Sequence, residues 1–265
     1  MSADREEAVL LRRDGPVTEL VLNRPDRLNA IDDELADGIL RGLDRVGADE
    51  SCRCLVITGS GRGFCSGQAL GGFGSGTALP QEVGALIRHR YIPIVTKIRD
   101  LPLPVVAAVN GAAAGAGFSL ALAADLRVAS EAAWFSCAFA GIGLVPDSGA
   151  SFFLPRYLGL SKAVELALTA KRLSAVEAAT LGLVAHVYPA ESFPHDYSAL
   201  ARQFAQGPTR AFALTKMALS QATANSLPQQ LELEAVLQQE AAETDDFREG
   251  LSAFREKRAP QFVGH

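Results

Sequence analysis

The chain has few of the residues that build disulfide frameworks or metal sites. Among its 265 residues, only four are cysteine and four are histidine. Four cysteines do not suggest a disulfide framework in a chain of this size. Cys52 and Cys54 are separated by one residue, but no second cysteine pair and no neighbouring histidine accompany them. We therefore expect no metal site.

The sequence also lacks an uninterrupted apolar run of membrane length and an excess of basic residues. Its most apolar stretch, residues 101–126, contains prolines, glycines and Asn110, so no membrane span is expected. Twenty-five Lys and Arg against 30 Asp and Glu give a net charge of −5, which argues against a nucleic-acid partner. The first seven residues, MSADREE, are charged where a signal peptide is basic and then apolar. We expect a cytoplasmic protein.

Glycine-rich stretches are present, but none matches a nucleotide-binding motif. The run Gly115-Ala116-Gly117 continues with Phe118-Ser119-Leu120, so the third glycine of the dinucleotide fingerprint is missing. The stretch 59–64 fails the same comparison, and no Gly-x-x-x-x-Gly-Lys-Ser/Thr occurs. A nucleotide cofactor is therefore not expected.

The order of the expected elements indicates an α/β core followed by helices. Residues 8–22 predict a β-hairpin around Asp14-Gly15, and Asp32 or Asp33 caps a helix that runs to about Val46. A strand at 55–58, a helix at 80–99 and further alternating elements follow to about residue 189. From 194 to 257 the pattern is helical. We expect a core at residues 1–195 and a helical region at 196–265.

The most informative segment is a run of small residues between an apolar strand and a helix. Residues 105–109 read Val-Val-Ala-Ala-Val, and Asn110-Gly111 lead into Ala-Ala-Ala-Gly-Ala-Gly-Phe-Ser. Residues 120–125 follow and are expected to form a helix, whose first N–H groups have no partner within the helix and can hold a developing negative charge. Small residues also allow a helix to pack closely on a sheet, so the run alone does not choose between these roles.

Five segments together resemble the enoyl-CoA hydratase/isomerase (crotonase) superfamily, in the right order and over nearly the whole chain. They are residues 23–30 (NRPDRLNA), 61–68 (GRGFCSGQ), 104–117, 143–156 (GLVPDSGA followed by LPR) and 246–260. The resemblance implies a spiral of ββα units with a C-terminal helical trimerisation region. It also implies a homotrimer or a dimer of trimers, an acyl-CoA thioester as substrate, and no cofactor beyond the coenzyme A of that substrate.

The shared chemistry that the resemblance implies is stabilisation of a thioester enolate by two main-chain N–H groups. By position, these donors are expected at Ser66 and Ala116. Loss of one such donor typically slows an enzyme by about 10²–10³-fold.

The resemblance also suggests residues that bind coenzyme A and line the acyl pocket. The channel is expected along Leu28, Ala30, Gly67, Gln68 and Ala69, with Phe139 in the acyl pocket. Arg27, Lys216 and Lys257 are candidate phosphate partners, and Phe254 is expected near the adenine, from the same or a neighbouring subunit. Each cation has a simpler alternative, because most surface Lys and Arg are only solvated.

Three positions depart from the pattern of a hydratase of this superfamily. The places of its two glutamates are taken by Ser119 and Phe139, which cannot exchange protons near neutral pH. Ala69 replaces a common aspartate, and the glycine-rich segment 71–76 that follows is expected to be mobile. Water addition by two carboxylates is therefore not expected.

One carboxylate remains in this region, Asp147 in Val-Pro-Asp-Ser-Gly-Ala. An aspartate just before the apolar run 151–154 is a good helix N-cap, and the residues alone favour that interpretation. The Pro-Asp-Ser-Gly pattern also resembles that of CoA-dependent isomerases of phenylacetate catabolism, in which an aspartate at this place moves a proton.

These features predict an enoyl-CoA isomerase in which Asp147 shuttles the proton. The alternatives are other chemistry of the same superfamily, including hydration or attack by Asp147 on an acyl or aryl carbon, and an acyl-CoA-binding protein without activity. His89, in a stretch with cationic neighbours, is expected at the surface. The alternative that the resemblance implies is an approach of His89 to the acyl pocket.

Overall fold

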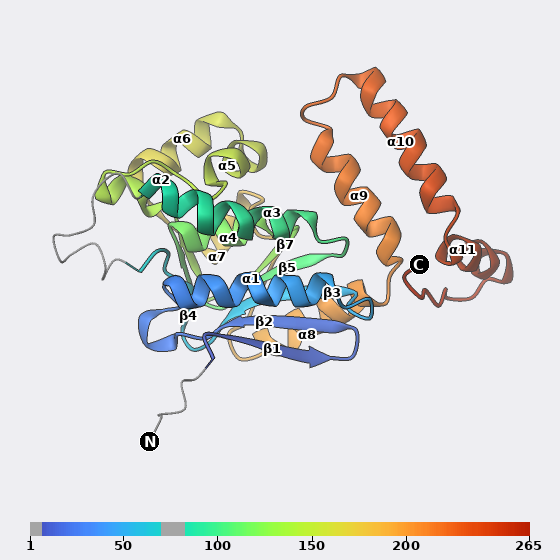
Figure 1. The fold of residues 1–265 in the computed structure, drawn as a ribbon, viewed down its shortest axis with the longest axis horizontal. Helices are drawn as coiled ribbons and strands as arrows, with labels where there is room; N and C mark the ends of the chain where they lie inside the picture. Colours follow the sequence, from blue (N-terminus) through green and yellow to red (C-terminus); the bar gives the residue numbers. More distant parts are fainter. Residues whose placement is uncertain (1–6, 70–82) are drawn as a thin grey trace.

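The computed structural model describes residues 7–69 and 83–265, which form two sheets surrounded by helices (Figure 1). The larger sheet has the strand order β1-β2-β3-β5-β7-β10. Its strands are β1 (Val9–Asp14), β2 (Val17–Leu22), β3 (Cys54–Gly59), β5 (Val105–Val109), β7 (Leu126–Ser130) and β10 (His186–Tyr188). The β1–β2 pair is antiparallel and the other pairs are parallel, so the Asp14-Gly15 hairpin is confirmed.

The smaller sheet has the order β4-β6-β8-β9 and takes one short strand from each successive unit. Its strands are β4 (Gly63–Cys65), β6 (Ala112–Ala114), β8 (Trp134–Ser136) and β9 (Arg172–Ser174). A strand of the large sheet, a strand of the small sheet and then a helix follow one another three times, at β3–β4, β5–β6 and β7–β8. This repetition confirms the expected ββα units.

The helices of the core follow these units and flank the large sheet. They are α1 (Asp33–Gly47), α2 (Val83–Leu86), α3 (Ile92–Asp100), α4 (Ala116–Ala123), α5 (Ala150–Leu158), α6 (Leu160–Thr169) and α7 (Ala175–Thr180). A π-helical turn, Ile87–Tyr91, joins α2 to α3. The expected cap of α1 is confirmed, because the Asp32 carboxylate accepts a hydrogen bond from the N–H of Leu35. The start of the helix expected from Pro80, and the segment 71–76, lie outside the described residues.

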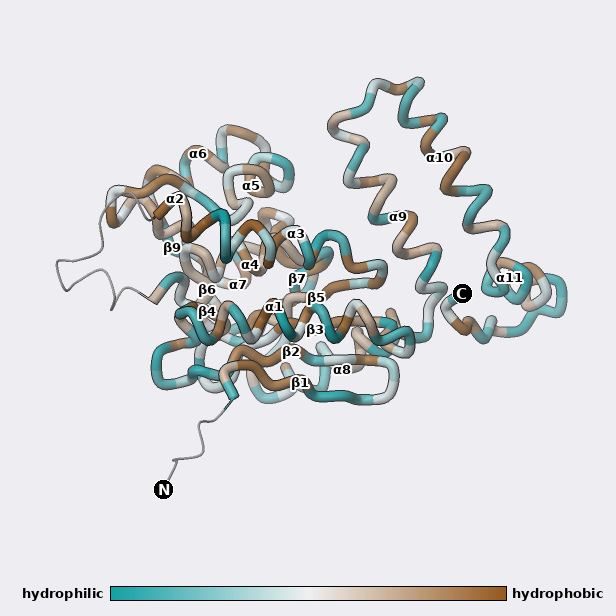
Figure 2. Tube along the Cα trace, in the orientation of Figure 1, coloured by the Kyte–Doolittle hydropathy of each residue, from teal (hydrophilic) through white to brown (hydrophobic). Residues whose placement is uncertain are grey.

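Alternation along the strands separates two apolar clusters on the two faces of the large sheet. In β5, Val105, Ala107 and Val109 pack with α1, α3 and α4, whereas Val106 and Ala108 face the other way. There they meet α8 (Phe193–Ala205), whose buried residues are Phe193, Tyr197, Ala201 and Ala205. Figure 2 shows the apolar character of the central strands and of α4. Helix α8 starts before residue 196 and covers the core sheet.

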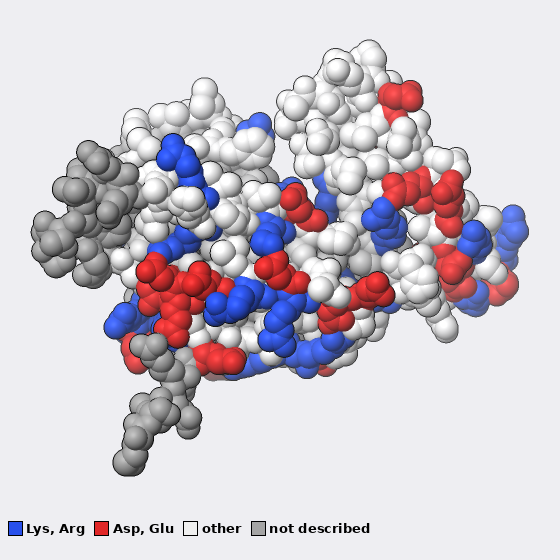
Figure 3. All heavy atoms as spheres, viewed as in Figure 1, with Lys and Arg blue, Asp and Glu red and all other residues white. Residues whose placement is uncertain are grey.

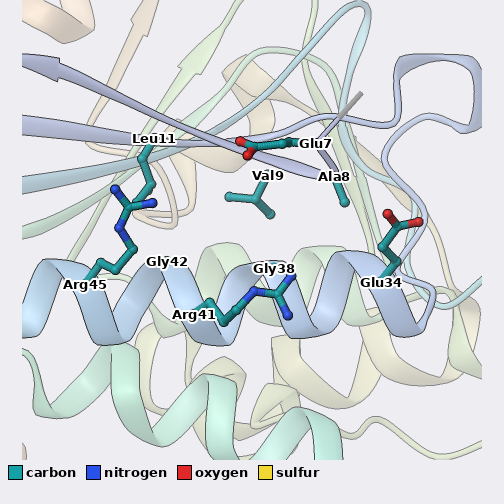
Figure 4. Close-up of a pocket in the computed structure, with 9 residues that line it drawn as sticks. All are labelled: Glu7, Ala8, Val9, Leu11, Glu34, Gly38, Arg41, Gly42 and Arg45. Atoms are coloured by element: carbon teal, nitrogen blue, oxygen red, sulfur yellow. The ribbon is translucent and has the colours of Figure 1, made fainter. Parts of the chain in front are cut away.

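Helix α1 packs closely against the β1–β2 edge of the sheet. A Cβ atom at Gly38 would lie 2.9 Å from a methyl carbon of Val9, and one at Gly42 would lie 2.9 Å from a methyl carbon of Leu20. Figure 4 shows this side of α1, with the side chains of Arg41 and Arg45 beside the two glycines. Small residues therefore allow the edge strands and α1 to share one apolar layer.

The last three helices project from the core (Figure 1). Helices α9 (Thr209–Gln221) and α10 (Leu227–Ala242) form a hairpin that ends in α11 (Asp245–Glu256). Leu219, Leu227 and Leu231 of this hairpin are exposed. In Figure 3, acidic and basic side chains are mixed over α1 and the β1–β2 edge, whereas the outer end of the hairpin carries few charges. In the described part of the chain, every helix is too short or too polar to cross a bilayer.

Candidate active site

The small-residue run forms a sharp turn into a fully buried helix. Strand β6 ends at Ala114, and Gly115 makes the turn with φ 52° and ψ −126°, a conformation that favours glycine. Helix α4 begins at the next residue, four residues earlier than the sequence suggested, and all eight of its residues are buried. Within the described residues the N–H of Ala116 has no hydrogen-bond partner. This amide is a free donor at the positive end of the helix.

The loop after β4 lies directly against the start of α4. Strand β4 pairs with β6, which brings Cys65 beside Ala113. A Cβ at Gly117 would lie 2.1 Å from the carbonyl oxygen of Cys65, and one at Gly67 would lie 3.5 Å from the nitrogen of Ala116. Both glycines are needed because main chain meets main chain here. The loop around Gly67 and the first amide of α4 therefore border the same small space.

The structure corrects the predicted donor at Ser66. The N–H of Ser66 donates to the carbonyl of Leu28 at 2.9 Å, so this donor is already engaged. Gln68 forms a parallel bridge with Ile31, in which Ile31 donates to the carbonyl of Gly67 (2.7 Å) and Ala69 donates to the carbonyl of Ile31 (2.9 Å). Because successive amides in extended chain point to opposite sides, the N–H of Gln68 points away from Ile31. It has no partner in residues 7–69 and 83–265. Gln68 therefore replaces Ser66 as the candidate donor opposite Ala116.

The structure brings the segment Arg27–Ala30 beside Ser66–Ala69. In addition to the Ser66–Leu28 bond, the Ser66 hydroxyl donates to the carbonyl of Arg27 at 3.3 Å. Asn29 is completely buried, and its amide donates to the carbonyls of Ser60 (3.0 Å) and Gly63 (2.8 Å). Leu28 and Asn29 both have positive φ angles, 50° and 53°. Asn29 therefore stabilises a strained turn that holds Leu28 and Ala30, two residues expected to contact coenzyme A, beside the segment Ser66–Ala69, and Arg27 is exposed at the edge of this turn.

Lys216, a predicted phosphate partner, has its ammonium group occupied inside the protein. It pairs with the Asp125 carboxylate at 2.7 Å and donates to the carbonyls of Leu101 (3.0 Å) and Leu103 (2.8 Å). Only 13% of its side chain is exposed. A phosphate would have to displace these partners, so the geometry speaks against the predicted role. Lys216 instead ties α9 to the core.

The remaining two predicted contacts, Phe254 and Lys257, are far from this loop in their own chain. Phe254 lies on α11 and is 82% exposed, and Lys257 follows as the exposed C-cap of that helix. Figure 1 places α11 at the opposite end of the molecule from β4. Within a single chain the two residues are therefore not part of this site.

Asp147 is held against the first turn of α4. The hydroxyl of Ser119, on α4, donates to the main-chain carbonyl of Asp147 at 3.0 Å. The Asp147 carboxylate accepts a hydrogen bond from the hydroxyl of Ser148 (2.7 Å), and it does not cap α5, whose N-cap is Gly149. The structure thus removes the N-cap interpretation of Asp147. Burial raises the pKa of this carboxyl above its usual range, and the Ser148 bond partly opposes the shift.

The surroundings of Asp147 are largely apolar and uncharged. Burial raises the pKa of the Cys137 thiol to about 11 and also raises that of the Tyr91 hydroxyl, and the nearby Asp147 charge adds to both shifts. Phe139, where a hydratase of the resembled superfamily has a glutamate, is 6% exposed. Ser119 occupies the other such place and is fully buried, with its hydroxyl also 3.3 Å from the carbonyl of Gly115. Among the described residues around the start of α4, Asp147 is therefore the candidate base.

The side chains that contact Gln68 were not predicted from the sequence. Its side-chain oxygen accepts hydrogen bonds from the Tyr91 hydroxyl (2.5 Å) and from Arg90 (3.1 Å). His89 is exposed, as expected. No local signal in the sequence marked Tyr91 as buried, and a buried hydroxyl needs a partner. In the described parts of the chain, no three His, Cys, Asp or Glu side chains gather as a metal site.

Comparisons with known proteins found a family model, related sequences and solved structures that match most of the chain. A family model described as Enoyl-CoA hydratase/isomerase matches residues 12–265. The "Probable enoyl-CoA hydratase" of Rhodobacter capsulatus is 45% identical over 245 residues, 92% of this chain and 93% of that protein. The 1,2-epoxyphenylacetyl-CoA isomerase of Escherichia coli is 41% identical over 259 residues, 97% of this chain and 99% of that protein. The crystal structure of an enoyl-CoA hydratase from Bacillus anthracis superposes with a TM-score of 0.91, at 30% identity, over 97% of this chain and 100% of that one.

Proposed function

Because the chain belongs to the enoyl-CoA hydratase/isomerase family, we propose that it isomerises the double bond of an enoyl-CoA with Asp147 as the proton shuttle. The observation that carries the proposal is the pairing of one half-buried carboxylate with unpartnered main-chain amides. The bond from Ser119 links the carbonyl of Asp147 to the helix turn that starts with Ala116. A single base suits a reaction that moves a proton within the substrate and adds no water.

The proposed reaction begins with a 3-enoyl thioester whose carbonyl oxygen lies between the N–H groups of Gln68 and Ala116. Asp147 takes a proton from C2, and the electron pair of that C–H bond delocalises into a dienolate whose oxygen bears the charge. The two amides stabilise this oxygen because their dipoles are already oriented. Asp147 then returns the proton to C4, which gives the conjugated 2-enoyl thioester. No atom is gained or lost.

The environment of Asp147 supports its role as a base of intermediate strength. A carboxylate with an ordinary pKa is a weak base for a C–H bond, and burial raises the proton affinity of this one. Ser119 and Phe139 provide no carboxylate to activate water, which favours isomerisation over hydration.

Coenzyme A is proposed to lie along the segments Arg27–Ala30 and Gly67–Ala69, which the structure joins by hydrogen bonds. Phe254 and Lys257 then serve the adenine and phosphates only from a neighbouring subunit of a homotrimer or dimer of trimers. The exposed apolar residues of α9 and α10 support such an assembly. We propose that residues 196–265, apart from the part of α8 that covers the sheet, form the oligomerisation region.

The test is turnover of a 3-enoyl-CoA beside a 2-enoyl-CoA, with the conjugated thioester followed by its absorbance and the products by mass. Conversion of the 3-enoyl substrate at constant mass is the expected result. Asp147→Asn keeps the shape of the side chain and should lower kcat by about 10²–10⁴-fold with little change in acyl-CoA affinity. A gain of one water on the 2-enoyl substrate, or full activity of Asp147→Asn, contradicts the proposal.

A second candidate substrate comes from the Escherichia coli relative, whose name specifies an isomerase of 1,2-epoxyphenylacetyl-CoA. At 41% identity over nearly the whole of both chains, this aromatic thioester belongs in the same assay. It too is rearranged at constant mass, so the assay by mass and absorbance separates it from hydration.

A further inference from the structure

We infer that Tyr91 is a positioning residue, which orients the main-chain N–H of Gln68 by holding the Gln68 side chain. The inference rests on the proposed function, because it concerns the amide that we assign to the oxyanion hole. Tyr91 itself does not contact the reacting atoms in this role. It acts through the Gln68 side-chain oxygen, to which its hydroxyl donates at 2.5 Å.

Gln68 is anchored on both sides of its main chain. On one side, the bridge to Ile31 engages the carbonyl of Gly67 and the N–H of Ala69, the groups that flank Gln68. On the other, the side chain is held by Tyr91 and by Arg90, and its own NH₂ group donates to the carbonyl of Ala69 at 3.2 Å. The bridge holds the Gln68 main chain from one side, so its peptide plane can still rotate about the chain axis. The hydrogen bonds of the Gln68 side chain restrict that rotation.

Tyr91 is a rigid support for this purpose. It lies in the π-helical turn between α2 and α3 and is only 4% exposed. Isolated π-helical turns are uncommon and often occur at functional sites. Its neighbour Arg90 forms an ion pair with Asp33 at the start of α1. The π-helical turn therefore connects the Gln68 loop to α1 as well as to α3.

The hydroxyl of Tyr91 remains a donor over the whole neutral range, because burial raises its pKa well above the ordinary value. If the hydroxyl is removed, the Gln68 oxygen keeps only the longer bond from Arg90. The Gln68 amide is then less precisely directed at the carbonyl oxygen of the substrate. Catalysis depends steeply on such placement, and a shift of about 1 Å typically slows a reaction by about 10²-fold.

The experiment compares Tyr91→Phe with Tyr197→Phe, which removes another buried tyrosine hydroxyl, on α8 at the far face of the large sheet. Isomerase kinetics are measured together with the infrared carbonyl band of bound hexanoyl-CoA labelled with ¹³C at the thioester. For Tyr91→Phe we expect kcat to fall by between about 10- and 100-fold with KM nearly unchanged, and the red-shift of the carbonyl band to decrease. Tyr197→Phe should change neither quantity.

A double variant shows whether Tyr91 acts through Gln68. Gln68→Ala keeps the main-chain N–H but removes the acceptor of the Tyr91 bond, and Tyr91→Phe should cause no further loss of kcat in that background. If Tyr91→Phe fails to fold, Gln68→Ala alone should show the reduced kcat and the reduced red-shift. Additive losses in the double variant, or a wild-type carbonyl band in Tyr91→Phe, would overturn the inference. If the wild-type protein itself shows no red-shift, the proposed function fails instead.

Discussion

The hydroxyl of Ser119 donates to the main-chain carbonyl of Asp147 at 3.0 Å and so ties the carboxylate-bearing loop to the helix whose first amide borders the loop at Gly67. This bond joins two segments that are 28 residues apart in the chain. The proposed base and the proposed oxyanion donor at Ala116 are therefore linked by this bond.

Ser119→Ala should consequently slow the reaction as well as weaken the fold. Loss of one buried hydrogen bond typically lowers the free energy of unfolding by about 1 kcal/mol. Ser136→Ala is the matched control, because Ser136 is also buried and its hydroxyl donates to the carbonyl of Ala170 at 2.8 Å. Denaturant unfolding should show similar losses for both variants, whereas kcat should fall only for Ser119→Ala. Equal kcat values in the two variants would show that the link to Asp147 has no catalytic effect.

The pH dependence of isomerisation should report the Asp147 carboxyl. Asp147 must be deprotonated to accept the C2 proton, so activity should be lost as the pH falls through its pKa. Since burial raises this pKa, the inflection of kcat/KM should lie above the 3.8 of an ordinary aspartate. Ser148→Ala removes the hydrogen bond that lowers the pKa, and the inflection should move to higher pH. An inflection that stays in place would exclude Asp147 as the titrating group.

The raised pKa of Asp147 also makes the free energy of unfolding depend on pH. The sign of this dependence is opposite to that of a salt-bridged aspartate, whose pKa is lowered. A carboxyl with a raised pKa binds its proton more tightly in the folded state, so folding is favoured below the ordinary pKa. This contribution is lost as the pH rises through the raised value. Asp147→Asn should therefore increase the melting temperature at neutral pH while it abolishes turnover. A lower melting temperature would mean that the charged carboxylate stabilises the fold.

Gly117→Ala should push the start of α4 away from the end of β4 and so distort the proposed oxyanion hole. The new methyl group would lie 2.1 Å from the carbonyl oxygen of Cys65, which is main chain and cannot rotate away. We expect kcat to fall by about 10²-fold or more, with a clear loss of stability. Gly47→Ala, at the end of α1, is the control, since its methyl group would meet only a side-chain carbon of Leu101 at 3.5 Å. Kinetics and thermal unfolding of the two variants would separate this steric effect from a general intolerance of alanine.

Lys216→Met should weaken the attachment of α9 without changing coenzyme A binding. The substitution leaves Asp125 with Arg99 as its remaining cationic partner and should lower the free energy of unfolding by about 3 kcal/mol. Lys162→Met, which removes an exposed pair with Glu165, should change stability little. Calorimetric titration with free coenzyme A checks whether its affinity stays unchanged in Lys216→Met. A large loss of affinity in Lys216→Met would restore the phosphate role that the sequence suggested.

Local signals in the sequence predicted most of the fold. The Asp14-Gly15 hairpin and the cap at Asp32 depend on neighbouring residues, and both are present in the structure. The start of α4 was placed four residues too late, because Ala116–Ser119 carry no charge or cap that marks a helix N-terminus. The short strand β6 also escaped notice, since three alanines have little strand propensity of their own and depend on pairing with β4 and β8.

Prediction of the site was less complete, because its details depend on contacts between distant segments. The choice between Ser66 and Gln68 follows from pairing with Leu28 and Ile31, about 37 residues earlier, which no local pattern reveals. The same holds for Tyr91 and for Lys216, whose partner Asp125 is 91 residues away. For Asp147 the residues alone favoured a helix N-cap and the family resemblance favoured a base, and only the structure showed that its carboxylate leaves α5 uncapped.

Helix α4 is buried along its whole length, with Arg127 donating to the carbonyls of Leu122 (3.5 Å) and Ala124 (2.9 Å) at its far end. Burial on all sides restrains such a helix, so its amide dipoles are oriented by the fold before any ligand arrives. The free-energy cost of orienting these dipoles is therefore met during folding and not during the reaction. A new reaction on this scaffold would then require changes only in the side chains around the fixed amides, at positions such as 119, 139 and 147.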